Sequence, residues 1–216
     1  MTIISLGEAL QDAVLFRDGD WVESKDQDPS GDVRLVQLAD IGEGTWLDKS
    51  RRFLTSEKSL ELGCSVLKKN DLLIARMPEP LGRACIFPGH TSACVTVVDV
   101  CIVRPNPKRV CPRYLMHMIN SAACRYQIAK FTTGTTRQRI SRRNLMKVEL
   151  PFPSLEEQQR VAAILDKADD LKAKRQQAID ELDKLQQAVF LDMFETAEVE
   201  QVSIQNLIET GVITLH

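Results

Sequence analysis

Hydrophobic residues fall into short runs up to position 150 and recur at helical spacing beyond it. The runs at 33–38, 72–75, 84–87 and 95–103 are rich in β-branched or apolar side chains and are bounded by Gly, Asp, Asn or Pro, as strands are. Ser5-Leu6-Gly7-Glu8 fits a capping box, so we expect a short helix from there to about Ala13. These elements predict a mixed α and β domain over residues 1–150.

A longer helix is expected to begin at Pro112, because proline suits the first helical turn, and to run to about Lys130. Its apolar stripe consists of Tyr114, Leu115, Met118, Ala122 and Ile128. Small and polar residues follow at 132–136 and predict a loop.

The sharpest boundary in the pattern lies at Pro151-Phe152-Pro153, which is incompatible with a continued central strand and with a helix. Ser154-Leu155-Glu156-Glu157 then supplies a second capping box. Neither Pro nor Gly occurs from there to about Glu195, so we expect one long helix of about 40 residues.

Within this helix, apolar residues recur at alternating steps of three and four, which is the spacing of a coiled-coil heptad. A helix this long with so narrow a stripe predicts pairing with another long helix, whereas a helix lying across its own domain would show a wider stripe. The one charged member of the stripe, Arg175, lowers stability but can fix register or orientation. The predicted pairing residues are Val161, Ile164, Ala168, Leu171, Arg175, Ala178, Leu182, Leu185 and Val189.

The composition allows a sizeable core, since 44% of the 216 residues are hydrophobic. No apolar run approaches the roughly 18 residues of a membrane span, and the best candidate, Cys94 to Val103, is short and contains Asp99. The first residues lack the basic and apolar regions of a secretory signal. We therefore expect a cytoplasmic protein without membrane contact.

The six cysteines are expected to be reduced thiols, because a chain of this length needs no disulfide staples and shows no export signal. Most lie among apolar residues, where a thiol behaves as a small buried hydrophobe. No metal site is expected, since the nearest cysteine spacing is Cys94 to Cys101 and the internal histidines are His90 and His117.

The distribution of charge changes the picture, because the formal net charge of −2 is made of unequal parts. Residues 1–100 carry −5, residues 101–150 carry +10 and residues 151–216 carry −7. Such a basic segment indicates a surface for a polyanion, and a solvated basic face without a ligand is the alternative.

Catalytic signatures are missing from the sequence. There is no phosphate-binding loop, no nucleophile elbow and no His-Glu-x-x-His helix, and Gly42-Glu43-Gly44 lacks the third glycine of a dinucleotide site. Arg104-Pro105-Asn106-Pro107 is interpreted as a turn, because it lacks the run with which amino-methyltransferases hold a target base. The sequence therefore predicts no catalytic residue.

Three passages together resemble the specificity subunits of type I restriction-modification systems. They are Gly-Thr-Thr-Arg-Gln-Arg-Ile-Ser at 134–141, Val-Glu-Leu-Pro-Phe-Pro at 148–153 and Leu-Glu-Glu-Gln-Gln-Arg-Val at 155–161. The last two resemble the family's Pro-x-Pro-(x)-Leu-x-Glu-Gln motif, at which a spacer helix begins. The stretch from Asn70 to Arg76 also resembles the family's Gly-Asp-Leu-Leu-Ile element, with Asn70 in place of the usual glycine.

The resemblance implies an α+β fold, with a target-recognition domain over residues 1–150 and a coiled-coil-forming spacer helix over 151–196. It implies a non-catalytic DNA-recognition subunit that holds no cofactor of its own. Its partners would be double-stranded DNA with a split target site, methyltransferase subunits that bring S-adenosylmethionine, and a restriction subunit.

The family's usual subunit has two recognition domains and two antiparallel spacer helices, whereas this sequence has one of each. A half-subunit that forms a homodimer and a fragment both stay open. Ser5 to Leu15 aligns without gaps on Ser203 to Ile213, so residues 197–216 are expected to begin a second repeat or form a C-terminal tail. Chance similarity over so short a stretch is the alternative.

DNA is expected to contact the segment 104–143, with 133–143 as its centre. Arg142 is the expected phosphate contact, Arg137 or Gln138 the expected base reader, and Ile140 the anchor of the loop. A self-contained nucleic-acid enzyme and a coiled-coil interaction protein with an incidental basic patch are the alternatives. The expected DNA-binding residues are Arg104, Lys108, Arg109, Arg125, Lys130, Thr133, Gly134, Thr135, Thr136, Arg137, Gln138, Arg139, Ser141, Arg142 and Arg143.

Overall fold

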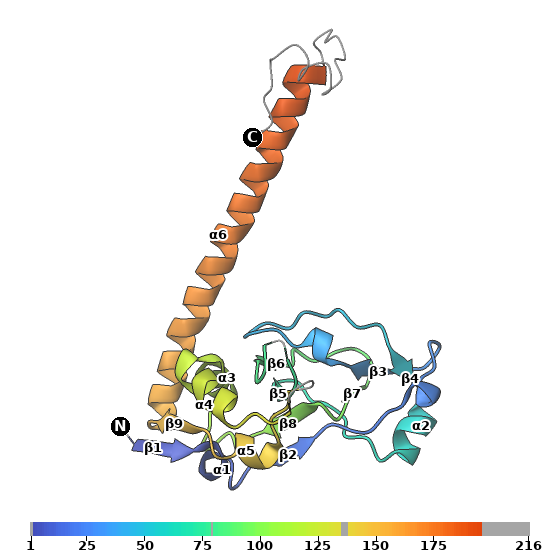
Figure 1. The fold of residues 1–216 in the computed structure, drawn as a ribbon, viewed down its shortest axis with the longest axis vertical. Coiled ribbons are helices and arrows are strands. Elements are labelled where there is room, and N and C mark those ends of the chain that lie inside the picture. The colour runs from blue at the N-terminus through green and yellow to red at the C-terminus, as the bar shows by residue number, and fades with distance from the viewer. Residues whose placement is uncertain (1, 79, 135–137, 196–216) are drawn as a thin grey trace. The chain divides into compact units, whose positions relative to one another are not determined.

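The computed structural model describes residues 2–78, 80–134 and 138–195 (Figure 1). The chain divides into a first unit that ends at Leu165 and a second that begins at Asp166. The described part of the first unit holds three β-sheets and several short helices, together with the start of the long helix α6 (Leu155–Glu195). The predicted α+β class, with a long helix after the mixed domain, is confirmed.

The four-stranded sheet runs in the order β2 (Leu15–Asp18), β8 (Val100–Arg104), β5 (Leu72–Ala75) and β6 (Ala84–Ile86), with antiparallel neighbours throughout. Leu72 and Ile74 belong to the core on one face of this sheet, and Leu73 and Ala75 belong to the core on the other. Because both faces are covered, the strands read as continuous apolar runs rather than as alternating ones.

A second sheet contains β4 (Phe53–Leu54), β3 (Val33–Val36) and β7 (Cys94–Thr96), and β3 and β7 are parallel. The prediction of one strand over 95–103 is wrong, because β7 and β8 belong to different sheets. The amide of Val100 donates to the carbonyl of Val97 (2.9 Å) and closes a turn between them. This turn is hidden in the sequence, since Val97 and Val98 are themselves β-branched. The connections include η1 (Ser24–Asp26), η2 (Leu38–Asp40) and α2 (Ser56–Glu61).

The third sheet pairs β1 (Thr2–Ser5) with β9 (Glu149–Phe152), so that the two ends of the mixed α and β domain lie side by side (Figure 1). Pro151 lies within β9, which is possible because a two-stranded sheet has no central strand. Helix α1 (Leu6–Ala9) follows β1 and ends earlier than expected. Its predicted cap is confirmed, since the Ser5 hydroxyl accepts from the amide of Glu8 (3.1 Å).

Two helices stand where one was predicted at 112–130. Helix α3 (Pro112–Asn120) ends before Ser121, and α4 (Ala122–Lys130) begins after it. The Ser121 hydroxyl donates to the carbonyl of Met118 (2.6 Å) and accepts from the amide of Cys124 (3.3 Å). A serine that satisfies both helix ends in this way competes with a continuous helix. Helix α3 packs on β5 and β6, and α4 packs on β9.

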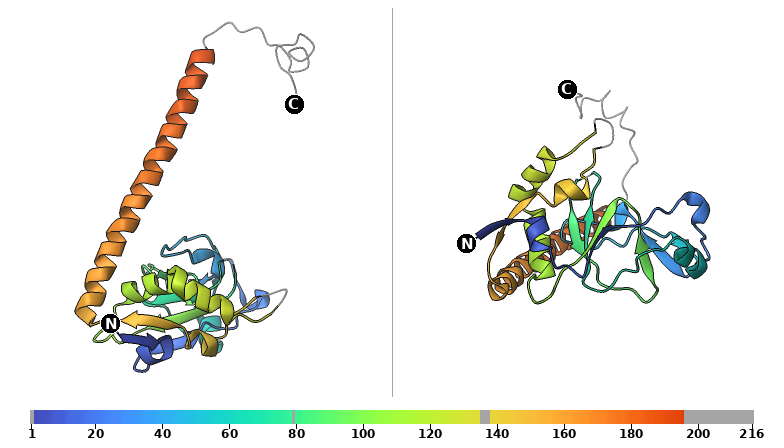
Figure 2. Two further views of the ribbon diagram at one scale, coloured as in Figure 1. Left: turned by 60° about the vertical axis from the view of Figure 1, so that its left-hand side comes forward. Right: turned by 90° about the horizontal axis from the view of Figure 1, so that it is seen from below.

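Helix α6 runs without a break (Figure 2) and is tied to the first unit at its start. The Ser154 hydroxyl accepts from the amide of Glu157 (3.3 Å), which confirms the predicted N-cap. The buried Gln158 side chain accepts from the amide of Cys111 (3.0 Å) and donates to the carbonyl of Arg109 (3.3 Å). None of the described helices has the length and apolar character needed to span a membrane.

Candidate nucleic-acid interface

The loop after α4 is closed at its base by two backbone hydrogen bonds. The amide of Thr133 donates to the carbonyl of Arg139 (3.1 Å), and the amide of Arg139 donates to the carbonyl of Thr133 (3.0 Å). Gly134 has a φ of +96°, which glycine adopts without strain. Thr133, Gly134 and Gln138 are exposed. Three expected contact residues lie outside the described residues: Thr135, Thr136 and Arg137.

The second arm of this loop is fixed to the core. Ile140 is fully buried, and its amide donates to the carbonyl of Arg76 (3.1 Å), which confirms the expected anchor. The guanidinium of Arg76, itself almost fully buried, donates to the carbonyl of Val98 (2.6 Å) and lies 3.2 Å from Asp18. Burial lowers the pKa of Arg76, and Asp18 opposes this effect. The loop therefore rests on a fixed base.

Cations gather on the short helix α5 (Arg142–Leu145) directly after the anchor. The Ser141 hydroxyl accepts from the amide of Asn144 (3.1 Å) and caps the helix. Arg143 is exposed, while Arg142 is half-buried with its guanidinium 5.8 Å from the centre of the Phe16 ring. A short capped helix that presents two adjacent arginines gives a defined position for anionic phosphates.

Two of the expected DNA-binding arginines have partners inside the domain. Arg104 makes a two-pronged ion pair with the buried Asp71 (2.7 Å for each hydrogen bond), which raises the pKa of the arginine. Arg125 donates to the carbonyl of Leu81 (2.7 Å) and pairs with Glu43 (3.1 Å). Both charges support the fold locally, so they offer less to a polyanion than the sequence count indicates.

The remaining expected cations differ in position. Arg109 donates to the carbonyl of Glu8 (3.0 Å), beside α1 and the start of α6. Lys108 is exposed in the same connection between β8 and α3. Lys130, at the end of α4, is exposed with its ammonium 4.2 Å from the centre of the Tyr126 ring. Arg139 pairs with Asp99 (3.0 Å) but keeps 41% of its side chain exposed.

Sequence reasoning missed the residues that support the loop. Asp18, Arg76 and Asp99 lie on three different segments, and nothing in their local sequence indicates that they meet beneath residues 139–140. Lys147, an exposed cation whose ammonium lies 5.9 Å from the centre of the Phe131 ring, was also missed. Position within a run of like charges would have been a usable signal for Lys147, whereas only the fold reveals the others.

The cysteines are free thiols, as expected, and four of them are buried. Burial raises the pKa of Cys85 to about 12 and that of Cys94 to about 11, so neither is a thiolate at neutral pH. Among the described residues, no group of three His, Cys, Asp or Glu side chains is placed to hold a metal ion.

The apolar stripe of α6 is a second candidate site. From Lys167 to Phe194 every described side chain is exposed. Leu171, Leu182 and Leu185 each keep more than half of their surface open. Phe190 and Phe194, outside the predicted set, lie with ring centres 4.5 Å apart and widen the apolar surface. Exposed apolar side chains in a continuous stripe are typical of a partner-binding surface.

Comparisons with known proteins place this geometry in one class. The family described as the type I restriction modification DNA specificity domain matches residues 17–182. A putative type I restriction enzyme specificity subunit of Haemophilus influenzae is 31% identical over 66% of this chain and 34% of its own length. The EcoR124I/EcoR124II specificity subunit of Escherichia coli is 28% identical over 66% of this chain and 35% of its own length.

Solved structures share the fold. The HsdS subunit from Thermoanaerobacter tengcongensis matches with a TM-score of 0.61 and 21% identity, over 90% of this chain and 45% of that one. A chain from a structural study of type I restriction-modification complex assembly matches with a TM-score of 0.62 and 23% identity, over 87% of this chain and 44% of that one.

The chain therefore belongs to the type I restriction-modification DNA specificity family, and the resemblance seen in the sequence is confirmed. It spans about a third of the length of the curated relatives it matches.

Proposed function

We propose that this chain recognises a DNA sequence within a type I restriction-modification complex. One observation carries the proposal: the exposed Thr133, Gly134 and Gln138 lie next to the buried anchor Ile140, and the two adjacent arginines of α5 follow it. A fixed base is needed for sequence readout, since base contacts depend on position, and cations supply the affinity for phosphates.

Within this surface the expected contacts take separate roles. Arg142 and Arg143 bind phosphates, and Arg139 joins them through the exposed part of its side chain. Gln138, with Arg137, reads bases, while the DNA backbone is contacted by Thr133, Gly134, Thr135, Thr136 and Ser141. Arg104 and Arg125 act mainly through Asp71 and Glu43, and Lys108, Arg109 and Lys130 extend the basic surface.

The proposal assigns no catalysis and no cofactor to this chain. Methyl transfer and cleavage belong to methyltransferase and restriction subunits, and S-adenosylmethionine to the methyltransferase. The relatives support this division, since each is named as the specificity subunit of a restriction enzyme. A cytoplasmic location fits such a complex.

The long helix supplies the second half of the proposal. Residues 1–150 contain the recognition domain, residues 151–196 contain the spacer helix α6, and residues 197–216 begin a second repeat or belong to a C-terminal tail. Two copies of the chain pair antiparallel along the seam from Val161 to Val189, because the described part of that seam exposes large apolar side chains. A homodimer would then present two recognition domains to the two halves of a split site.

The test of DNA recognition is binding of the full chain to duplex DNA over a range of salt concentrations, followed by fluorescence anisotropy. Arg142→Ala should weaken binding to all sequences alike and reduce the salt slope by about one. Gln138→Ala should weaken binding to the preferred sequence by about 1–3 kcal/mol and relax the preference at one position. Lys58→Ala, which removes a charge from α2, is the control.

One outcome would contradict this role for the loop. If alanine at Arg137, Gln138 and Arg142 together left DNA affinity and its salt dependence unchanged while assembly with the methyltransferase subunit failed, the loop would be a protein contact instead.

A further inference from the structure

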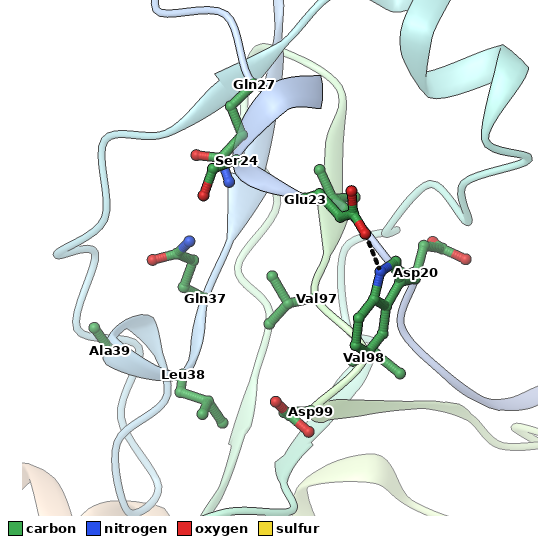
Figure 3. Close-up of a pocket in the computed structure, with 12 residues that line it drawn as sticks. Asp20, Glu23, Ser24, Gln27, Gln37, Leu38, Ala39, Val97, Val98 and Asp99 are labelled. Carbon is green, nitrogen blue, oxygen red and sulfur yellow. Dashed lines mark hydrogen bonds between the residues drawn. The ribbon is translucent and has the colours of Figure 1, made fainter.

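A groove outside the basic segment lies between three parts of the recognition domain (Figure 3). Its walls are the connection that includes η1, the segment Gln37–Ala39 and the turn at 97–99 between β7 and β8. Its volume of about 710 Å³ lies within the range of ligand sites, roughly 300–1,000 Å³. The groove can therefore admit groups of the size of a nucleobase edge.

The lining of the groove combines hydrogen-bonding groups with an apolar floor. Figure 3 shows Glu23, Gln27, Gln37 and Asp99 around the opening, with Val97 between them. Carboxylates accept hydrogen bonds, and carboxamides both donate and accept. This is the set of groups that reads base edges, since Gln pairs with adenine and Glu or Asp accepts from the amino group of cytosine.

An exposed aromatic side chain belongs to the same groove. Trp21 lines it with 69% of its surface open, and its indole Nε1 donates to Glu23 (3.2 Å). The hydrogen bond orients the carboxylate and leaves its other oxygen for Lys25 (2.7 Å). A large apolar ring so exposed, next to an ordered carboxylate, is typical of a contact surface rather than of a packing residue.

The groove and the candidate DNA loop share one support. Asp99, which lines the groove, pairs with Arg139 of the loop (3.0 Å). Val98 also lines the groove, and its carbonyl accepts from the guanidinium of Arg76. The carbonyl of Arg76 in turn accepts from the amide of Ile140. DNA that rests on the loop would therefore lie next to the groove.

Cations at the rim balance the acidic lining. Arg52 donates to the side-chain oxygen of Gln27 (2.9 Å), and both Arg52 and Lys25 are exposed. Arg139 stands at the other side through its pair with Asp99. Hydrogen-bond acceptors thus line the groove, and cations lie at its rim. This arrangement is complementary to duplex DNA, which presents base edges within a groove and phosphates along its borders.

We propose that this groove is a second readout surface of the recognition domain, and that it selects bases that present an amino group in the major groove, adenine or cytosine. The inference rests on the proposed DNA recognition and adds residues from the segment 1–100, which carries a net charge of −5 and lies outside the expected DNA-contact segment. Glu23 and Gln37 are the specificity-determining residues: the carboxylate accepts from an amino group and repels the O6 of guanine and the O4 of thymine.

The experiment selects binding sequences from a random duplex pool with the full chain. Glu23→Gln and Gln37→Ala are each expected to lose the preference for adenine or cytosine at one or two positions. Each should weaken binding to the preferred duplex about 5- to 150-fold, with an unchanged salt slope. Glu57→Gln, an exposed carboxylate on α2, is the matched control and should select the wild-type sequence.

A second arm removes the amino group from the DNA. Purine in place of adenine, or 2-pyrimidinone in place of cytosine, at the affected position should weaken wild-type binding by a similar factor. The same change should not weaken binding further in the variant that has lost the contact.

Three results would overturn the inference. If the groove variants select the wild-type sequence with wild-type affinity, the inference fails while DNA recognition stands. If they bind DNA normally but no longer assemble with the methyltransferase subunit, the groove is a protein-docking site. If the wild-type chain selects no sequence, the proposed function and this inference fail together.

Discussion

The first turns of α6 and the remainder of the same helix differ in what surrounds them. In the first unit, Gln158 and Ala162 are buried, and Gln158 bonds to backbone groups of a neighbouring loop. In the second unit, every described side chain from Lys167 to Phe194 is exposed, including the large apolar residues. One continuous helix thus contains a part that is complete within the chain and a part whose apolar surface is uncovered.

This difference shows that helix formation and helix burial are separate requirements. The backbone ladder of a helix satisfies itself, so the helix can extend beyond the domain that starts it. A long stripe of exposed leucine and phenylalanine costs free energy in water, and covering it is favourable. Mutations in the exposed part of the helix should therefore affect association most. Mutations in the anchored part should affect the stability of the fold most.

The largest effect is expected from breaking the exposed part. Replacing Leu182 and Leu185 by Asp would place two unpaired carboxylates in the pairing surface and should abolish association. Analytical ultracentrifugation of the full chain should show a dimer for the wild type and a monomer for the double variant. Gln177→Asp with Gln187→Asp adds the same charge off the seam and should stay dimeric. A wild-type chain that is monomeric at high concentration would exclude self-pairing.

A smaller effect is expected from the anchored part. Gln158→Ala removes the partners of the Cys111 amide and the Arg109 carbonyl, both polar backbone groups, and should lower the free energy of unfolding by about 1–3 kcal/mol. Thermal unfolding measures this loss, and sedimentation should show little change in association. The neighbouring Gln159 is exposed, so Gln159→Ala should melt like the wild type. Equal melting temperatures for the two variants would contradict the anchor.

The proposed pairing surface can also be tested at its charged position, Arg175. Arg175→Leu replaces a cation by an apolar side chain in the proposed interface and should strengthen association about tenfold, or about 1.4 kcal/mol. Dilution series in the ultracentrifuge would show the change as a lower dissociation constant. Lys174→Leu, one position off the seam, should have no such effect. Weaker association of the Arg175 variant would place this residue in a specific ion pair across the interface.

The smallest effect is expected at the helix cap. Ser154→Ala removes the hydroxyl that accepts from the amide of Glu157 and should cost about 1 kcal/mol of stability. Chemical denaturation should report it as a lower midpoint with an unchanged slope. Ser92→Ala, at an exposed serine before β7, is the control. A variant as stable as this control would show that the first turn of α6 is held by Gln158 alone.

Local signals in the sequence predicted the elements whose ends are marked by capping or turn residues. The caps at Ser5 and Ser154 and the strand Leu72–Ala75 stand where they were predicted. Asn70 shows the same principle in detail, because it has a φ of +72° at the position where the family has glycine. Asparagine tolerates this left-handed conformation better than most residues, so the substitution keeps the turn.

What the sequence could not predict depends on contacts between distant segments. The strand β1 is recognisable only through its partner β9, and the break at Ser121 depends on how one hydroxyl is shared between two helix ends. The same limit applies to charge. Arg104 and Arg142 each add one positive charge to the sequence count, but Arg104 forms an ion pair with Asp71. The acidic partners come from residues 1–100, so a charge sum by segment cannot show which cations are free for DNA.

The pairing of β1 with β9 has a consequence for how recognition domains can be exchanged. Residue 2 lies opposite residue 152, so the polypeptide comes into the domain and leaves it at one place. A different domain that begins and ends on such a pair of strands, and that keeps the backbone groups bound by Gln158, could replace this one without shifting the helix that follows. The recognition domain is in this sense an exchangeable module, because both of its ends lie on one two-stranded sheet.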